Sequence, residues 1–440
     1  MPLSELPGYK GEVLKLLTEA SVSIGDLVQV IKDGAIYEGV LMPRYELADE
    51  LHLVIKLKSG YNIGIRITPN IRVIKLGAGT KPTFTPPPLP KSKPELPKVS
   101  IISTGGTIAS RVDYRTGAVG AALSAEDLIS IVPELSDIAN IRAEILYRVF
   151  SEDVHAPHWT GMANAVAKHI NEGAEGIVIC HGTDTMGYTA AALSFALQNL
   201  PVPVILVGSQ RSSDRPSSDA AMNLINAVFA AAKAPFAEVA ISMHESVSDT
   251  STVVHKGTKV RKCHTSRRDA FESVNASPLA KVESGKITML TTNYTERDPK
   301  RRLVLKPNFD ERVALIKFHP GTNPKLIDYL VDEGYLGIVL EGTGLGHVGD
   351  YLLDSIKRAV QKGVVIGMTS QCIWGRVNMN VYDRGMDLQT MGVIPLEDML
   401  PETALVKLMW VFGQTKDTDE VKKLLLTNIA GEISARTIYG

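Results

Sequence analysis

Three short segments of this 440-residue sequence combine glycine with hydroxyl, carboxylate and amine side chains. They read TGGTIA at 104–109, HGTDTM at 181–186 and VRKCHTS at 260–266. Hydrolysis of an amide requires a nucleophile, a group that takes its proton, donors for the oxyanion and an anchor for the charged ends of the substrate. The three segments together contain groups for all of these tasks, so amide hydrolysis is the chemistry that we expect.

The first segment follows a strand that we expect at 99–103. Gly105 and Gly106 let the backbone approach a ligand closely and direct amide N–H groups toward it, while Thr107 offers a hydroxyl. A phosphate-binding loop is the alternative interpretation, although this segment matches neither GxGxxG nor the GxxxxGK of a P-loop.

The second segment follows an apolar run at 176–180, which predicts a buried strand, and it leads directly into a helix. Thr183 and Asp184 therefore lie beyond the carboxyl end of a strand, where ligands bind in open parallel sheets. A structural role is the alternative, because Thr or Asp at a helix N-cap satisfies backbone amides.

The third segment places Lys262 in a basic stretch that also contains Lys256, Lys259, Arg267 and Arg268. Two other interpretations of this stretch stay open. One is a solvated basic face, and the other is a patch of cations that contacts nucleic-acid phosphates.

An alternation of strands and helices must position these segments, and it starts at residue 98. We expect strands at 99–103, 141–149, 176–180, 202–207 and 238–243, and helices near 125–132, 158–171, 185–198 and 218–232. Apolar runs such as IVIC and VILVG indicate a mainly parallel, Rossmann-like sheet that is covered on both faces. A second alternation, with strands at 313–318, 338–340 and 364–368, predicts a smaller α/β domain.

The N-terminal part follows a different pattern. Short β-type runs at 27–31, 35–42, 51–58, 62–65 and 71–76 predict a small closed or nearly closed β-barrel after a short helix near 11–17. Asp33-Gly34 between the first two runs is a hairpin signal. Prolines are dense between 77 and 97, which predicts a semi-rigid linker; a PxxP ligand for an SH3-like partner is the alternative. We therefore expect a β-barrel domain over 1–76, a linker over 77–97, a catalytic α/β domain over 98–290 and a smaller α/β domain over 311–440.

The composition excludes several classes of protein. Apolar residues make up 44% of the chain and charged residues 22%, as in ordinary globular proteins. A formal net charge of −1 provides no global basic field for nucleic acid. No leader segment or membrane-length apolar run is evident, so we expect a cytoplasmic protein. The three cysteines lack CxxC spacing, which argues against disulfides or a structural zinc site, and we expect no metal.

In this order and at these intervals, TGGTIA, HGTDTM and VRKCHTS resemble the type I and II L-asparaginase family. The resemblance implies an asparaginase-like pair of α/β domains, with active sites completed by a neighbouring subunit. It also implies that Thr107 is the first catalytic threonine and that Thr183, Asp184 and Lys262 form a second catalytic group. In that group a lysine made neutral by its surroundings takes a proton from Thr183, directly or through water.

The same resemblance implies a set of substrate-binding residues. Tyr114 corresponds to the tyrosine of a loop that closes over the substrate, and Gly106 contributes backbone beside it. Ser151 and Glu152 correspond to the segment that holds the α-carboxylate and α-ammonium of an amino acid. Many asparaginases have glutamine where this chain has Glu152, a difference that bears on selectivity more than on the type of reaction.

The segments YEGVLMP at 37–43 and SGYNIGI at 59–65 resemble the N-terminal domain of the D subunits of archaeal-type glutamyl-tRNA(Gln) amidotransferases. This second resemblance implies that glutamine supplies ammonia to a partner E subunit, which amidates Glu-tRNA(Gln) with ATP and Mg. It implies no cofactor in this chain, tRNA held mainly by the partner, and a homodimer within a heterotetramer. The alternatives are a free-standing L-asparaginase with an accessory β domain and a non-catalytic RNA-binding or scaffold protein.

Overall fold

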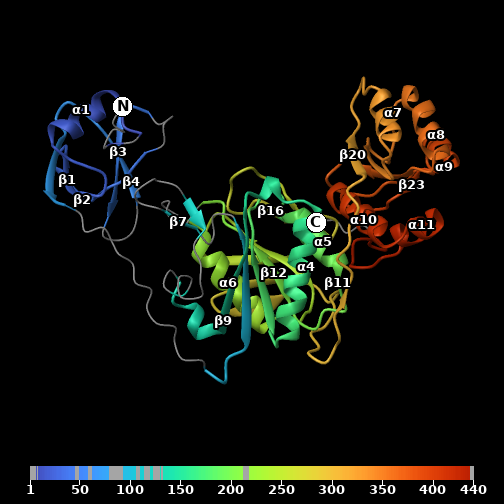
Figure 1. The fold of residues 1–440 in the computed structure, drawn as a ribbon, viewed down its shortest axis with the longest axis horizontal. Coiled ribbons are helices and arrows are strands. Elements are labelled where there is room, and N and C mark those ends of the chain that lie inside the picture. Colours follow the sequence, from blue (N-terminus) through green and yellow to red (C-terminus); the bar gives the residue numbers. More distant parts are fainter. Residues whose placement is uncertain are drawn as a thin grey trace.

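The computed structural model describes residues 6, 8–44, 49–57, 62–78, 93–105, 110–112, 119–121, 129, 132–211 and 218–436. Along the chain these residues form a small β domain, a central α/β domain and a C-terminal α/β domain (Figure 1). The prolines between 79 and 92 and most of the helix expected near 125–132 lie outside the described residues.

The N-terminal domain is a five-stranded antiparallel sheet in the order β4-β3-β2-β1-β5. It consists of α1 (Gly11–Glu19), β1 (Leu27–Lys32), β2 (Ala35–Leu41), β3 (His52–Leu57), β4 (Asn62–Arg66) and β5 (Arg72–Gly77). The predicted hairpin turn is present, because Asp33 and Gly34 both have positive φ, 50° and 81°, as a type I′ turn requires. Alternate residues such as Val28 and Val30 form the domain's own hydrophobic core.

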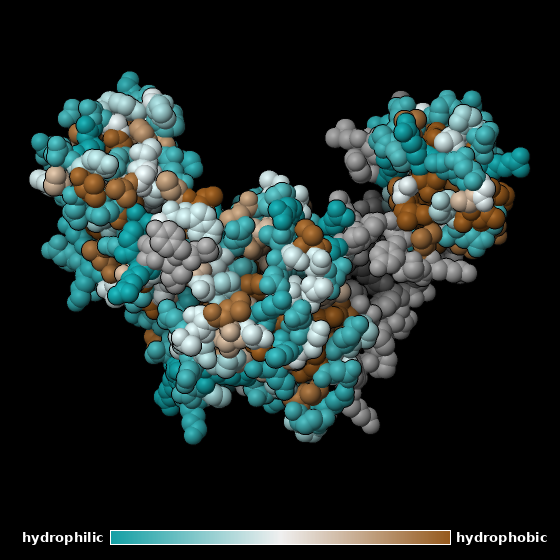
Figure 2. Space-filling model, turned by 180° about the vertical axis from the view of Figure 1, so that it is seen from behind, coloured by the Kyte–Doolittle hydropathy of each residue, from teal (hydrophilic) through white to brown (hydrophobic). Residues whose placement is uncertain are grey.

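Apolar side chains are also exposed on this domain. Ile36, Ile74 and Leu76 are 61%, 42% and 45% exposed. Figure 2 shows brown patches among hydrophilic atoms on the lobe that this domain forms, at the right of the view.

The central domain is built on an eight-stranded sheet in the order β18-β17-β14-β13-β12-β10-β6-β9. Its parallel strands are β6 (Lys98–Gly105), β9 (Asn140–Val149), β10 (Gly176–Cys180), β12 (Val204–Val207) and β13 (Val239–His244). The sheet continues with antiparallel strands β14 (Ser251–Lys256), β17 (Ala280–Glu283) and β18 (Lys286–Met289). We did not predict this extension, because a strand such as β14 is buried on both faces and shows no alternation.

Helices cover both faces of the sheet, as predicted. Ile177 and Ile179 of β10 pack with α4 (Ala156–Asn171) and α5 (Met186–Ala196), whereas Val178 and Cys180 pack on the opposite face with α6 (Ala220–Lys233). Shorter elements complete the domain: β7 (Ser110–Val112) with β8 (Val119–Ala121), α3 (Leu135–Ile138), η1 (Ser151–Asp153), β11 (Leu197–Gln198) with β19 (Val304–Leu305), and β15 (Val260–Lys262) with β16 (Phe271–Ser273).

The C-terminal domain has a parallel sheet of β20 (Val313–Lys317), β21 (Gly337–Gly342), β22 (Val365–Ser370) and β23 (Ile394–Pro395). Its helices are α7 (Lys325–Asp332), η2 (Asp350–Leu352), α8 (Leu353–Gln361), α9 (Asp383–Met391), α10 (Pro401–Gln414) and α11 (Thr418–Leu426). Helix α10 packs on α5 of the central domain, where the rings of Phe195 and Trp410 stack with centroids 5.9 Å apart. The two α/β domains therefore share one hydrophobic core.

Candidate active site

Lys262 of the VRKCHTS segment contacts two residues of the HGTDTM segment. Its Nζ donates hydrogen bonds to Thr183 Oγ1 and to Asp184 Oδ1, both at 2.8 Å. Thr183 is buried and the Lys262 side chain is 13% exposed, whereas that of Asp184 is 69% exposed, so the group opens to solvent on the side of Asp184. These three side chains, predicted to lie together, are in direct contact although 79 positions separate Thr183 from Lys262.

Thr183 and Asp184 occupy the turn between β10 and α5. The strand ends at Cys180 and the helix begins at Met186, with Thr185 as its N-cap. The side chains of Thr183 and Asp184 bond to Lys262 instead of to the helix amides, so the capping interpretation does not explain them.

Lys262 ends the short strand β15, which forms a hairpin with β16. The base of this hairpin is attached to the C-terminal domain. Lys259 Nζ bonds to Asp398 Oδ2 at 2.8 Å, with both side chains buried, and Arg261 pairs with Glu402 at 3.1 Å. Residues far along the chain thereby determine where Lys262 stands.

The basic stretch around this hairpin is not a cationic surface. Each of its lysines and arginines pairs with a carboxylate: Lys256 with Glu238, Lys259 with Asp398, Arg261 with Glu402, Lys262 with Asp184, Arg267 with Asp269 and Arg268 with Asp249. Because phosphate binding needs cations that are available to the ligand, this pairing argues against the nucleic-acid patch.

Ser151 lies beside the Thr183 turn, as the substrate-binding prediction requires. It is the first residue of η1, with Phe150 between it and the end of β9, and it is 5% exposed, while Glu152 next to it is exposed. Thr185 Oγ1 donates to the Ser151 carbonyl, and a Cβ added at Gly182 would come within 2.7 Å of Ser151 Cβ. Glycine is therefore required at position 182 for the two loops to meet.

Gly106, Thr107 and Tyr114 lie outside the described residues, so their predicted roles stay predictions. The strand that leads to Thr107 is described. β6 pairs with β10 in parallel, Ser103 opposite Cys180, and Thr104 Oγ1 donates to the Cys180 carbonyl at 3.0 Å. The carboxyl ends of these two strands are thus adjacent in the sheet.

His181, two positions before Thr183, is buried and was not among the predicted site residues. His181 Nδ1 lies 2.7 Å from the Gly182 carbonyl and must donate to it, so Nε2 accepts from Thr189 Oγ1 at 2.9 Å. Trp159 Nε1 donates to the same hydroxyl at 3.1 Å. Burial lowers the pKa of His181 to about 4, which keeps the ring neutral. The only sequence indication was its place before Gly182.

Family models match three regions of the chain. Residues 22–76 match the GatD N-terminal domain, residues 98–295 match the N-terminal asparaginase domain, and residues 312–425 match the glutaminase/asparaginase C-terminal domain. Relatives match along almost the whole length. The D subunit of the glutamyl-tRNA(Gln) amidotransferase of Pyrococcus furiosus is 54% identical over 97% of this chain and 98% of its own. The D subunit of Metallosphaera sedula is 51% identical over 98% of this chain and 97% of its own length.

This chain belongs to the family of glutamyl-tRNA(Gln) amidotransferase D subunits. Solved structures agree with the asparaginase-like fold. The L-asparaginase of Thermococcus kodakarensis matches with a TM-score of 0.69 at 33% identity, covering 77% of this chain and 100% of its own. L-asparaginase I of Vibrio cholerae matches with a TM-score of 0.68 at 30% identity, covering 77% of this chain and 99% of its own. The predicted family and fold class are confirmed.

Membership in the family makes the chain an enzyme of the asparaginase-type amidohydrolase class, as the motifs predicted. In the part of the chain that the structure describes, no group of three or more His, Cys, Asp or Glu side chains is placed to hold a metal ion. No helix among the described residues has the length and apolar character needed to cross a membrane.

Proposed function

We propose that this chain hydrolyses the side-chain amide of glutamine with a threonine nucleophile, and that the ammonia passes to a partner subunit. The observation that carries the proposal is the position of Lys262 Nζ, 2.8 Å from both Thr183 Oγ1 and Asp184 Oδ1. A threonine hydroxyl is a weak nucleophile, and it needs an adjacent base that a third group orients.

In the proposed reaction, Lys262 acts in its neutral form. The amine keeps one N–H on the Asp184 carboxylate and accepts the Thr183 proton through its lone pair. The oxygen that bonds to the amide carbon of glutamine is that of Thr183, or that of Thr107 with its proton passed to the Thr183 oxygen. The C–N bond then breaks as Lys262 returns the proton to the leaving nitrogen, which releases ammonia. Water hydrolyses the resulting ester to glutamate and restores the threonine.

Ser151 and Glu152 are the proposed anchor for the charged end of glutamine. The buried position of Ser151 beside Gly182 supports this role, because the segment then lies next to the Thr183 turn. A carboxylate at Glu152 suits the α-ammonium group, because charge-assisted hydrogen bonds are the stronger ones. Gly106, Thr107 and Tyr114 would complete the site.

The destination of the ammonia is proposed from the relatives, which are named as D subunits of glutamyl-tRNA(Gln) amidotransferase. We propose that a partner E subunit receives the ammonia and converts Glu-tRNA(Gln) to Gln-tRNA(Gln), using ATP and Mg bound to that partner. This chain would need no cofactor of its own. The net charge of −1 supports a partner that holds most of the tRNA. A homodimer of this chain within a heterotetramer, in the cytoplasm, completes the proposal.

A free-standing asparaginase is the second candidate, because the matching solved structures are named L-asparaginases. The two candidates differ in their dependence on a partner. A glutaminase subunit should prefer glutamine and should work faster in the presence of an E subunit and Glu-tRNA(Gln). A free-standing asparaginase should prefer asparagine and should not respond to either addition.

The test measures ammonia release from glutamine and from asparagine by the complex and by the chain alone. Thr107→Ala, Thr183→Ala and Lys262→Met should each reduce kcat on glutamine by about a hundred-fold or more, because a nucleophile or base is removed. Ser246→Ala, in a loop outside this group, is the control and should leave kcat unchanged. Ammonia release by the Thr183 and Lys262 variants at the rate of the control would overturn the proposed chemistry.

A further inference from the structure

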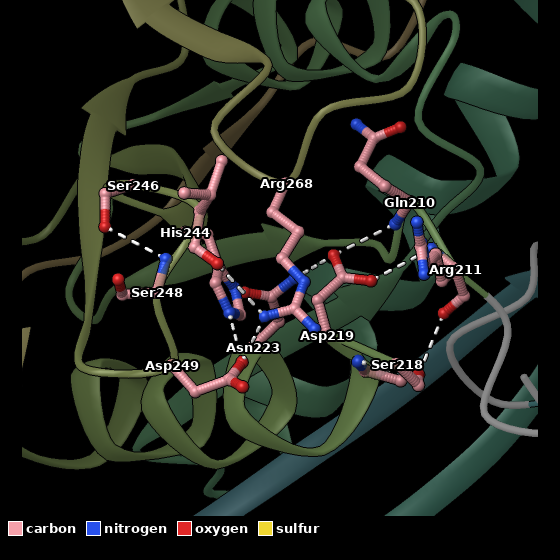
Figure 3. Close-up of polar contacts among 12 residues, drawn as sticks. Gln210, Arg211, Ser218, Asp219, Asn223, His244, Ser246, Ser248, Asp249 and Arg268 are labelled. Carbon is pink, nitrogen blue, oxygen red and sulfur yellow. Dashed lines mark hydrogen bonds and ion pairs between the residues drawn. The ribbon is translucent and has the colours of Figure 1, made fainter. Parts of the chain in front are cut away.

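A second polar cluster lies in the central domain, and it does not include the residues of the proposed site (Figure 3). Asp219 and Asn223 come from the start of α6, His244 ends β13, Asp249 follows on the β13–β14 loop, and Arg268 lies in the loop of the Lys262 hairpin. The first three residues are at most 1% exposed. Buried polar groups of this kind are normally hydrogen-bonded, so each contact can be assigned a donor and an acceptor.

The orientation of the Asn223 amide follows from its neighbours. Its Nδ2 lies 3.0 Å from the Gly208 carbonyl and 3.0 Å from Asp219 Oδ2, which are both acceptors. The NH2 group must therefore face these two oxygens, since a flipped amide would place an oxygen against a carbonyl and a carboxylate. The oxygen Oδ1 of Asn223 then faces His244.

Both ring nitrogens of His244 consequently face acceptors. Nδ1 lies 2.6 Å from Asn223 Oδ1, and Nε2 lies 3.1 Å from the carboxylate oxygen Oδ1 of Asp249. A neutral imidazole has one donor and one acceptor nitrogen, whereas an imidazolium has two donors. Only the imidazolium satisfies both contacts.

Asp249 is ionised, so both of its carboxylate oxygens are acceptors. Burial raises its pKa, but the hydrogen bonds from His244 and Arg268 outweigh that effect and leave the pKa below its usual range. Arg268 donates to the same Asp249 oxygen at 2.7 Å. Beyond Asn223, the Asp219 carboxylate accepts from the backbone amides of Gln210 and Arg211 at 3.0 and 2.9 Å. Charges of alternating sign thus run from α6 to the hairpin loop.

This chain of contacts ends on the hairpin that carries Lys262. Arg268 also donates to the Val247 carbonyl at 3.2 Å, and its side chain is 14% exposed. Cys263, directly after Lys262, donates its backbone N–H to Ala270, so the loop between them closes on itself. Displacement of the loop would therefore move the end of β15, where Lys262 stands.

We propose that His244 is a buried imidazolium that positions Lys262 by holding the hairpin loop through Asp249 and Arg268. This inference rests on the proposed function, because it assigns His244 a role in the chemistry of Lys262. His244 is a positioning residue and does not touch the substrate. Glutamine at this position would be neutral and could keep a donor toward only one of the two acceptors.

The spectroscopic test uses the full-length chain with 15N-labelled histidine. The His244 resonances are those lost in His244→Gln, and near neutral pH both ring nitrogens should carry a proton. One protonated and one bare nitrogen in the wild-type ring would overturn the proposal. This readout does not depend on enzymatic activity, so it remains valid even if the proposed reaction is wrong.

The kinetic test uses glutamine as the substrate and the chain in complex with its partner. His244→Gln and Arg268→Lys should each lower kcat about ten-fold or more with a much smaller change in KM, because Lys262 is displaced while the substrate anchor is intact. Thermal unfolding confirms that each variant is folded, and Arg268→Lys keeps the charge if His244→Gln does not fold. Ser246→Ala removes only the hydrogen bond from the Ser248 N–H in the same loop, keeps every member of the chain of contacts and should match wild type.

Two results separate the failure of this inference from the failure of the proposed function. If Lys262→Met is inactive while folded His244→Gln and Arg268→Lys retain the wild-type kcat, the positioning role is wrong and the proposed function stands. If Lys262→Met retains its activity, the proposed function is wrong.

Discussion

The attachment of the Lys262 hairpin to the C-terminal domain can be tested at the buried pair between Lys259 and Asp398. Lys259 Nζ donates to Asp398 Oδ2 at 2.8 Å and to the Asp398 carbonyl at 3.1 Å. The two side chains are 1% and 0% exposed. We predict that Lys259→Met destabilises the protein strongly, because it leaves the carboxylate buried without its closest cation.

The expected loss of stability in Lys259→Met depends on the contacts that the Asp398 carboxylate keeps. Breaking a buried pair on one side costs about 3–5 kcal/mol. Asp398 keeps the backbone amide of Ser434 at 2.9 Å, and Arg376 at 4.0 Å supplies a more distant positive charge. We therefore expect the free energy of unfolding to fall by the lower end of this range, about 3 kcal/mol. At about 2–4 °C per kcal/mol for domains of this size, Tm should fall by roughly 6–12 °C.

Replacing both Lys259 and Asp398 should recover most of the stability that the single variant loses. Burial lowers the pKa of Lys259 despite the opposing effect of Asp398, so taking the ammonium out of water is costly in itself. A neutral pair removes that cost together with the attraction, and such replacements are often close to neutral in stability. The double variant Lys259→Met/Asp398→Asn should melt much closer to wild type than the single variant does.

The assay is thermal unfolding followed by circular dichroism, with kcat measured on the same samples. Lys93→Met is the matched control, because Lys93 and Asp137 form a similar ion pair at 2.9 Å but their side chains are 44% and 78% exposed. Exposed pairs contribute about 0–1 kcal/mol, so this variant should melt within about 2–4 °C of wild type. A Tm for Lys259→Met equal to that of the control, or a double variant as unstable as the single one, would refute the reasoning.

Three further predictions concern the site and its surroundings. Asp184→Asn removes the carboxylate that bonds to Lys262 and should lower kcat about a hundred-fold in an ammonia-release assay; a rate near wild type would count against its role. Gly208→Ala places a methyl group 2.7 Å from Thr183 Cγ2 and should also lower kcat, whereas Gly64→Ala meets nothing within 4 Å and should not; equal rates for these two variants would contradict the geometry. Burial lowers the pKa of His255 from 6.5 to about 4. Between these two pH values the unfolded chain therefore binds a proton at His255 that the folded chain does not. Stability should thus fall by up to about 3 kcal/mol as pH drops through that window, and the fall in Tm between pH 7 and pH 5 should be smaller in His255→Gln; the same fall in both proteins would show that His255 is not responsible.

Several features were predictable from the sequence because they depend on neighbouring residues. The apolar run at 176–180 predicted β10 with its observed bounds, and Asp33-Gly34 predicted the first hairpin of the N-terminal domain. Each motif of the proposed site follows the end of an expected strand or lies in a short segment of distinctive composition. Local pattern was sufficient there, since strand burial and turn geometry are decided by a few consecutive side chains.

The partners of the charged residues were not predictable in this way. The sequence presents Lys256, Lys259 and Arg268 as one basic stretch, yet each has a different acidic partner, and that of Lys259 is 139 positions away. Nothing in the sequence indicates the proposed charge on His244, because that proposal depends on the amide orientation of Asn223 on another element.

From the sequence alone come the family, the α/β architecture and the residue types available for amide hydrolysis. The tertiary structure decides which of these residues meet: it brings Lys262 to Thr183 and Asp184, and it buries Lys259 against the C-terminal domain. The physical reason is that strand and turn preferences act over a few residues, whereas hydrogen bonds and ion pairs depend on distances that only the packing of remote elements determines.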